Sequence, residues 1–220
     1  MSKLRAILLM PPALGASAIK LAAEAGVALE AQIVNDLDAL KKAHEKKSDL
    51  LLSFGTGVIV PPAILDLPGL LALNVHAASP AYPGRDPHHF AVYDGAKEYG
   101  ATMHCMTARV DAGPIVDVEL FEVPPHATPA TLLESANLAG LVLVKRLFDG
   151  LRDGNTPTRL DSISWGTRKS TRRMFLEMCR VDSTMSLDEF NRRLRATGMP
   201  GYNNVYVELH GRRFYIEGQQ

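Results

Sequence analysis

The sequence has few cysteines and no net charge, and each shortage excludes a class of protein. Its 220 residues include two cysteines, Cys105 and Cys179, which are too far apart for the ligand spacing of a zinc site. Two distant thiols fit a reducing compartment better than a disulfide framework, so we expect a cytoplasmic chain. Lys plus Arg and Asp plus Glu each number 24, which gives no overall attraction to nucleic acid or to an anionic membrane.

Long apolar runs and phosphate-binding loops are also missing. No segment approaches the roughly 20 apolar residues that a membrane-spanning helix needs. Neither GxxxxGK[ST] nor GxGxxG occurs, and the FGTG at 54–57 is only a weak glycine signal. The sequence therefore predicts no membrane partner and no conventional phosphate loop.

The first 155 residues predict an α/β domain with a doubly wound, mostly parallel sheet. Short apolar strands alternate with helical patterns, which is typical of a parallel sheet covered on both faces. The strands are expected at 4–10, 29–34, 50–54 and 71–76, and the helices at 14–25 and 36–46. Two further strands, at 101–106 and 116–123, are joined by a loop, and a long helix follows from Pro129 to about Leu151.

The remaining residues, 156–220, predict a short C-terminal appendage made of a helix and a hairpin. Residues 152–162 have the composition of a linker. Ser186 and Glu189 form a capping box that opens a helix over 187–197. Two strand-like segments then flank His210-Gly211, which suits a two-residue hairpin turn. Trp165 is interpreted as packing for this tail.

A polar cluster marks the end of the fourth predicted strand. Asn74 and His76 are two residues apart, so they point to the same side, and ligands of open α/β sheets bind beyond the carboxyl ends of strands. Asp111 lies in the later loop VDAGPI. An amide, an imidazole and a carboxylate suit attack on a carbonyl: Asn74 stabilises the oxyanion, His76 does so or moves a proton, and Asp111 orients His76 or raises its pKa. The alternative is a strand-end cap beside a common turn.

The motifs around these residues resemble the folate-dependent formyltransferases, which act on methionyl-tRNA, glycinamide ribonucleotide or nucleotide sugars. The resemblance covers about residues 50–151 and rests on N-V-H, a loop ending P-G-R, Y-G-A-T-M-H-C-M and V-D-A-G-P-I-V. It implies that Asn74, His76 and Asp111 are catalytic and that 10-formyltetrahydrofolate is the formyl donor. The stretch VIVPPAIL is similar to the family segment whose backbone holds the pterin, which implies that Val58–Val60, with Asp111, contact the donor.

Departures from the family pattern indicate the acceptor. The loop AASPAYPGRDP is closer to a branch that acts on amino sugars, and PPALGAS lacks the basic insertion of tRNA-formylating members. We therefore expect a small primary amine, on a nucleotide-linked sugar, rather than tRNA. The candidate substrate contacts are Arg85, Arg168, Arg172 and Arg173, with a solvated basic loop as the alternative. Three alternatives remain: a deformylase that uses water, an enzyme like the methionyl-tRNA formyltransferases, and a non-catalytic folate- or nucleotide-binding module.

The other histidines and the tail aromatics carry the remaining predictions. No carboxylate lies at ligand spacing beside the four histidines His88, His89, His104 and His126, so no metal site is expected, and the first two are expected to start a helix. Four aromatic residues favour a homodimer face on the hairpin: Tyr202, Tyr206, Phe214 and Tyr215.

Overall fold

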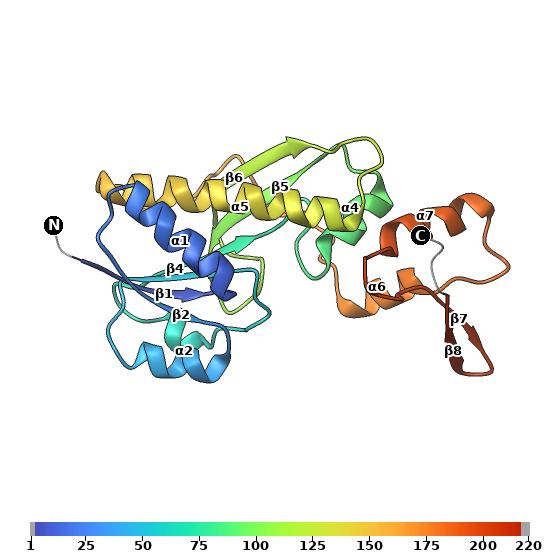
Figure 1. Ribbon diagram of the computed structural model, residues 1–220, viewed down its shortest axis with the longest axis horizontal. Helices are drawn as coiled ribbons and strands as arrows, with labels where there is room; N and C mark the ends of the chain where they lie inside the picture. The colour runs from blue at the N-terminus through green and yellow to red at the C-terminus, as the bar shows by residue number, and fades with distance from the viewer. Residues whose placement is uncertain (1–2, 217–220) are drawn as a thin grey trace.

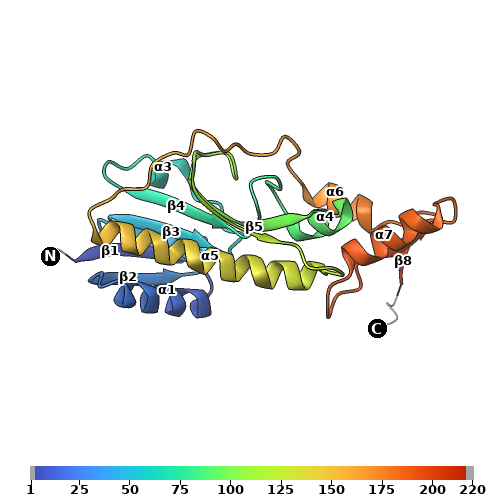
Figure 2. The ribbon, with the colours of Figure 1, turned by 90° about the horizontal axis from the view of Figure 1, so that it is seen from above.

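Six strands form one mixed sheet in the computed structural model, which describes residues 3–216 (Figures 1 and 2). In sheet order they are β2 (Leu29–Val34), β1 (Leu4–Leu9), β3 (Leu50–Phe54), β4 (Leu71–His76), β5 (Glu98–Cys105) and β6 (Ile115–Glu122). The first four in this order are parallel, whereas β5 and β6 pair antiparallel. The predicted α/β fold with a mostly parallel sheet is confirmed.

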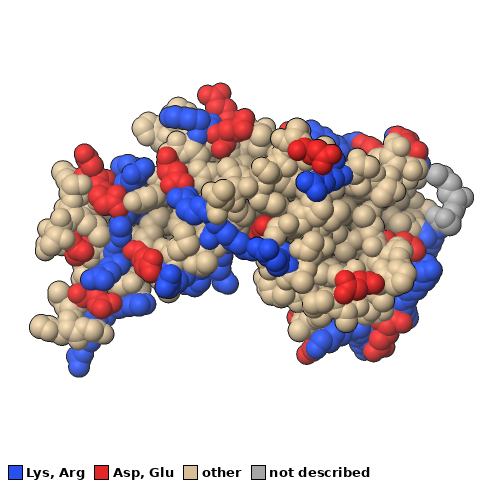
Figure 3. All heavy atoms as spheres, turned by 180° about the vertical axis from the view of Figure 1, so that it is seen from behind, with Lys and Arg blue, Asp and Glu red and all other residues tan. Residues whose placement is uncertain are grey.

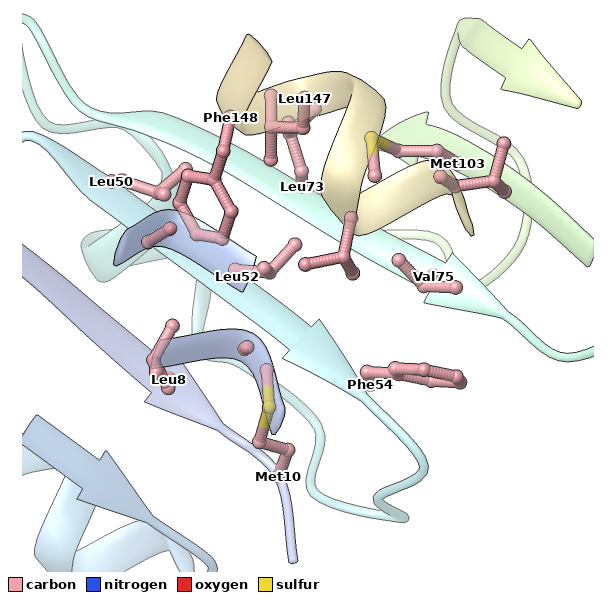
Figure 4. Close-up of a cluster of buried hydrophobic side chains, with 14 of the residues drawn as sticks. Leu8, Met10, Leu50, Leu52, Phe54, Leu73, Val75, Met103, Leu147 and Phe148 are labelled. Atoms are coloured by element: carbon pink, nitrogen blue, oxygen red, sulfur yellow. The ribbon is translucent and has the colours of Figure 1, made fainter. Parts of the chain in front are cut away.

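Helices cover both faces of the sheet, and the strands are apolar because both faces are buried. On one face lie α1 (Pro12–Glu24) and α5 (Pro129–Arg152), and on the other α2 (Leu37–His44) and α3 (Pro62–Leu65). Alternation along the strands divides the core: Leu8 and Leu52 point toward α1 and α5 (Figure 4), whereas Leu9 and Leu51 point toward α2 and α3. All five residues of β3 are buried.

The helix ends follow the local sequence signals. Thr128 caps α5 by accepting a hydrogen bond from the Thr131 amide, and Pro129 takes the first helical position. Asp36 caps α2 in the same way. The helix α4 (Pro87–Asp94) begins one residue before the expected His88-His89 start. The helix α6 (Arg172–Cys179), which Thr171 caps, has no counterpart among the predicted elements.

The C-terminal elements pack against α4 at the far end of the sheet (Figure 1). They are α6, α7 (Leu187–Thr197) and the hairpin of β7 (Tyr206–Leu209) and β8 (Arg212–Tyr215). His89 Nδ1 donates to the Ala196 carbonyl at 2.7 Å, which ties α4 to α7. The appendage therefore rests on the edge of the α/β unit through its own small apolar core.

One aromatic of the predicted dimer face is not available. Tyr206 is only 4 % exposed, and its hydroxyl donates to the Leu176 carbonyl at 3.2 Å. The expectation that it joins an exposed aromatic face is wrong, because the hairpin turns this ring inward onto α6. Tyr202, Phe214 and Tyr215 remain exposed.

The segment between α5 and α6 is bonded to the α/β unit along its length. The Leu160 amide donates to the Ile115 carbonyl and the Gly166 amide to the Pro80 carbonyl, both at 2.8 Å. We therefore propose that the boundary expected near residue 155 is better drawn near residue 171, where α6 begins. Among the helices formed by residues 3–216, none combines the length and the hydropathy of a membrane span.

Candidate active site

Strand pairing brings Asn74 beside His104, which was not among the predicted catalytic residues. In the antiparallel register of β4 and β5, Asn74 lies opposite His104, and the distance from Asn74 Nδ2 to His104 Nε2 is 3.1 Å. The Asp111 carboxylate, 6 % exposed, faces this pair: its Oδ1 lies 3.5 Å from His104 Nε2 and 3.7 Å from His76 Nδ1. The structure thus brings the three predicted residues together, with His104 at their centre.

Backbone carbonyls determine which ring nitrogens carry hydrogen. His76 Nε2 lies 2.9 Å from the Tyr82 carbonyl, and His104 Nδ1 lies 2.9 Å from the Cys105 carbonyl. A carbonyl oxygen only accepts, so both of these nitrogens are donors. In the neutral rings, His104 Nε2 then accepts from the Asn74 amide. One hydrogen of that amide remains free for a ligand.

The Asp111 loop is held by close backbone contacts. The Gly84 amide donates to Asp111 Oδ2 at 3.0 Å, and Asp111 itself has a positive φ of 43°, which Asp tolerates better than most residues. At Gly113 a Cβ would lie 1.9 Å from the Cys105 carbonyl oxygen, so only glycine fits there. The glycine two residues after Asp111 therefore allows the close packing that holds the Asp111 carboxylate beside the histidines.

Burial dominates the electrostatics of His76. It lowers the pKa of His76, and the neighbouring Asp111 charge, which raises that pKa, does not offset it. The predicted net rise in the pKa of His76 is therefore wrong, although the direction of the Asp111 effect is as expected. Burial alone would raise the pKa of Asp111, but the contact with His104, the nearby His76 and the hydrogen bond from the Gly84 amide hold it below its ordinary value.

These side chains lie in a cavity of about 510 Å³, a size typical of small-molecule sites. Asn74, His76, His104 and Asp111 all line it, and so do the predicted donor contacts Val58–Val60. Residues 56–60 form neither helix nor strand, so their backbone groups are not committed to a ladder. Ile59 is 61 % exposed at the rim, whereas Val60 is buried in the core.

The predicted substrate-contacting arginines are not gathered at the cavity. Arg85 lines it, and Arg172 lies 3.8 Å from Asp86, which also lines it. Arg168 instead pairs with Asp94 beneath the Phe90 ring, and Arg173 lies on the surface 3.6 Å from Glu177. Neither of these two is among the cavity-lining residues.

Four cavity or near-cavity residues were not predicted to act at the site: His88, His104, Trp165 and Lys169. His104 stands in the motif Y-G-A-T-M-H-C-M, so the resemblance already contained its signal. His88 lines the cavity, and its Nδ1 is enclosed with no hydrogen-bond partner among residues 3–216. Within those same residues, no group of three His, Cys, Asp or Glu side chains is arranged to hold a metal ion.

Comparison with known proteins identifies the family of these motifs. Residues 12–143 match the model described as formyl transferase. The methionyl-tRNA formyltransferase of Staphylococcus epidermidis is 28% identical over 178 residues, covering 80% of this chain and 56% of its own length. That of Macrococcus caseolyticus is 32% identical over 118 residues, covering 53% and 38%. The chain spans about half the length of the curated relatives it matches.

Solved structures share the fold over nearly the whole chain. A 4-N formyltransferase from Francisella tularensis superposes with a TM-score of 0.79 at 19% identity, covering 96% of both chains. An N-formyltransferase from Helicobacter canadensis, solved with folinic acid and dTDP-3-aminofucose, gives a TM-score of 0.70 at 17% identity, covering 96% of this chain and 85% of its own.

Proposed function

Since the chain belongs to the formyl transferase family, we propose that it moves a formyl group from 10-formyltetrahydrofolate to a primary amine on a nucleotide-linked sugar. One observation carries the proposal: Asn74, His104, His76 and Asp111 converge within hydrogen-bonding or ion-pairing distance in the lining of a single cavity. The matched family region, residues 12–143, contains all four of these residues.

The Asn74 amide and the His104 imidazole act together on the carbonyl of the formyl group. Asn74 keeps one amide hydrogen free while its other hydrogen bonds His104, so its donor direction is fixed before a substrate arrives. That hydrogen stabilises the oxyanion that forms when the amine attacks the formyl carbon. His104 fixes the amide orientation and acts through Asn74.

Asp111 and His76 handle the amine proton. The attacking amine loses one proton, and the nitrogen that releases the formyl group gains one. The His76 Nδ1 lone pair lies 3.7 Å from the Asp111 carboxylate, so a proton taken up there forms an imidazolium beside a negative charge. Burial lowers the pKa of His76, which favours release of this proton. The amine reaches this pair directly or through a water molecule.

The donor fits the side of the cavity formed by residues 56–60. The formyl donor supplies an activated carbonyl carbon, and Val58–Val60 would hold its ring through apolar contact and through backbone groups other than the Val58 amide, which donates to Thr56 Oγ1. Asp111 would lie at the reacting end. Folate should then protect the amides of residues 58–60 and of the Asp111 loop from hydrogen exchange. Protection confined to residues 160–216 would contradict this assignment.

The acceptor fits the side of the cavity around α4. Arg85, Lys169 and Asp86 line that part and offer charged partners for a phosphate and for polar groups of a sugar. His88 adds a neutral imidazole, because burial and the neighbouring histidines lower its pKa to about 3. The Helicobacter canadensis structure holds a folate and a nucleotide-linked amino sugar together, which is the ligand pair proposed for this chain.

Methionyl-tRNA is the second candidate acceptor, because the curated relatives carry that name. A tRNA reader depends on many phosphate contacts from unpaired basic side chains. Here Arg168 pairs with Asp94, Arg146 with Asp117 and Glu119, and Arg152 with Asp153. On the face drawn in Figure 3, basic side chains lie among acidic ones. We therefore favour the small amine.

Release of tetrahydrofolate separates the candidates. The purified chain is incubated with 10-formyltetrahydrofolate and either a dTDP-linked amino sugar, another small amine, methionine-charged initiator tRNA or no acceptor. We expect release with at least one small amine and none with tRNA. Efficient formylation of tRNA would replace the sugar proposal, equal release without acceptor would favour the deformylase, and binding without any release would favour the binding module.

We also propose that two copies associate through the hairpin. Leu209, Phe214, Tyr215 and Tyr202 are each more than half exposed on or beside β7 and β8. Leu209 and Phe214 share one face of the hairpin, and large exposed apolar side chains that lie together mark interaction sites. Phe214→Ser should then convert a dimer into a monomer in light scattering, and a monomeric wild-type chain would contradict the proposal. A cytoplasmic location stays a prediction, consistent with two free thiols.

A further inference from the structure

Residues 160–170, here called the strap, cross the α/β unit between α5 and α6 (Figure 2). Besides the bonds at Leu160 and Gly166, the Ser170 amide donates to the Pro83 carbonyl at 2.9 Å, and the Ser170 hydroxyl donates to the Arg85 carbonyl at 2.6 Å. At Gly84 a Cβ would lie 2.3 Å from the Ser170 carbonyl oxygen. The strap is therefore pressed against the loop that follows His76.

Trp165 is the point where the strap meets the active site. Its indole N–H donates to the Gly113 carbonyl at 2.8 Å, two residues after Asp111. Its ring lies edge-on to His104, with centroids 5.1 Å apart and planes at 84°, and to His76, at 5.9 Å and 67°. One half-buried side chain thus contacts the end of β4, the end of β5 and the Asp111 loop.

We propose that Trp165 is a positioning residue of the formyl transfer reaction, which holds both imidazoles and the Asp111 loop in register and keeps water from His76. The inference rests on the proposed function. Trp165 is not among the cavity-lining residues, so it acts through its neighbours rather than on the substrate. A misplacement of about 1 Å at such groups costs on the order of 10²-fold in rate.

If Trp165 shields His76 from water, removing its ring should change the pKa of His76 in a direction that can be measured. Burial is the largest influence on His76 and lowers its pKa. The charged or titratable groups around His76 are Asp111 in its loop, His104 on β5, Lys169 in the strap and His88 on α4. Removing the indole deletes none of these charged groups and admits water, so the pKa of His76 should move up toward its ordinary value.

Two substitutions separate the two roles of Trp165. Trp165→Phe keeps a ring over the histidines but loses the hydrogen bond to Gly113, and Trp165→Ala loses both. We expect kcat to fall about 3- to 10-fold in the first variant and about 10- to 100-fold in the second, with the KM for the amine changing less than about threefold. Leu187→Ala, which removes a large apolar side chain that is 73 % exposed on α7, is the control and should leave both parameters unchanged.

The decisive readout is the imidazole titration, followed by NMR in the absence of turnover and assigned with His76→Asn. The His76 midpoint should rise in Trp165→Ala and stay near the wild-type value in Trp165→Phe. If Trp165→Ala loses activity with an unchanged His76 midpoint, or keeps wild-type kcat, the proposal is overturned. If Trp165→Ala does not fold, the loss of kcat in Trp165→Phe decides. An inactive wild-type chain would reject the proposed function, while the titration would still test Trp165.

Discussion

Replacing Asn74 with alanine tests the assignment of the oxyanion donor. Asn74 lines the cavity, and its Nδ2, which carries two hydrogens, lies 3.1 Å from His104 Nε2. Loss of one preorganised oxyanion donor costs about 10²–10³-fold in kcat, or about 2.7–4 kcal/mol of transition-state stabilisation. The structural cost should be smaller: one hydrogen bond is worth about 1 kcal/mol, which shifts Tm by roughly 2–4 °C in a chain of this size.

The expected loss of kcat is much larger than the expected loss of stability, so measuring both separates a catalytic role of Asn74 from a structural one. Formyl transfer is measured by tetrahydrofolate release and unfolding by circular dichroism on the same samples. Asn74→Asp keeps the shape but removes both donor hydrogens, so it should lose at least as much activity as Asn74→Ala. Asn204→Ala removes a comparable amide hydrogen bond, 2.9 Å to the Thr197 carbonyl and far from the cavity, and should keep wild-type kcat. Activity of Asn74→Ala within a few-fold of wild type would reduce Asn74 to a strand-end cap.

Three further predictions follow from the same site. Asp111→Asn removes the charge that raises the pKa of His76, so NMR titration should find that pKa lowered further; no change would mean that the two side chains do not interact. His88 has a pKa of about 3 in the folded chain against 6.5 when unfolded, so the unfolded chain binds the proton first and stability falls as pH drops below 6.5. Urea unfolding between pH 6.5 and 5 should show a loss of stability that is smaller by about 2 kcal/mol in His88→Gln than in the wild type, and that is unchanged in the exposed-site variant His126→Asn. Gly113→Ala should abolish formyl transfer, because its Cβ would lie 1.9 Å from a β5 carbonyl; an active, stable variant would show that this loop can move.

Local sequence signals predicted most of the helices and strands. Apolar runs that alternate with helical periods are sufficient for a parallel sheet, because each run is buried on both faces. Capping residues such as Thr128 and Ser186 gave helix starts that the structure reproduces. The helix α6 was missed because it is only 8 residues long, so the helical spacing of its buried residues Phe175, Met178 and Cys179 covers little more than one turn.

The sequence by itself determined the chemistry of the cluster. Asn74 and His76 share one side of β4 because strand side chains alternate, and the glycine two residues after Asp111 indicates a tight loop. It could not determine the environment of those groups. Whether an imidazole gains or loses a proton depends on the balance between burial and neighbouring charge, and both are sums over residues distant in sequence.

Only the tertiary structure decided which residues complete the site. His104 joins Asn74 because β5 runs antiparallel beside β4, and Trp165 joins them because the strap returns across the sheet after the 24-residue helix α5. The sequence grouped Arg168 and Arg173 with the substrate contacts. In the structure Arg168 pairs with Asp94 and Arg173 with Glu177. Periodicity tells on which side of an element a residue lies. Which elements become neighbours is decided by the packing of all the apolar faces together, and that information is not local.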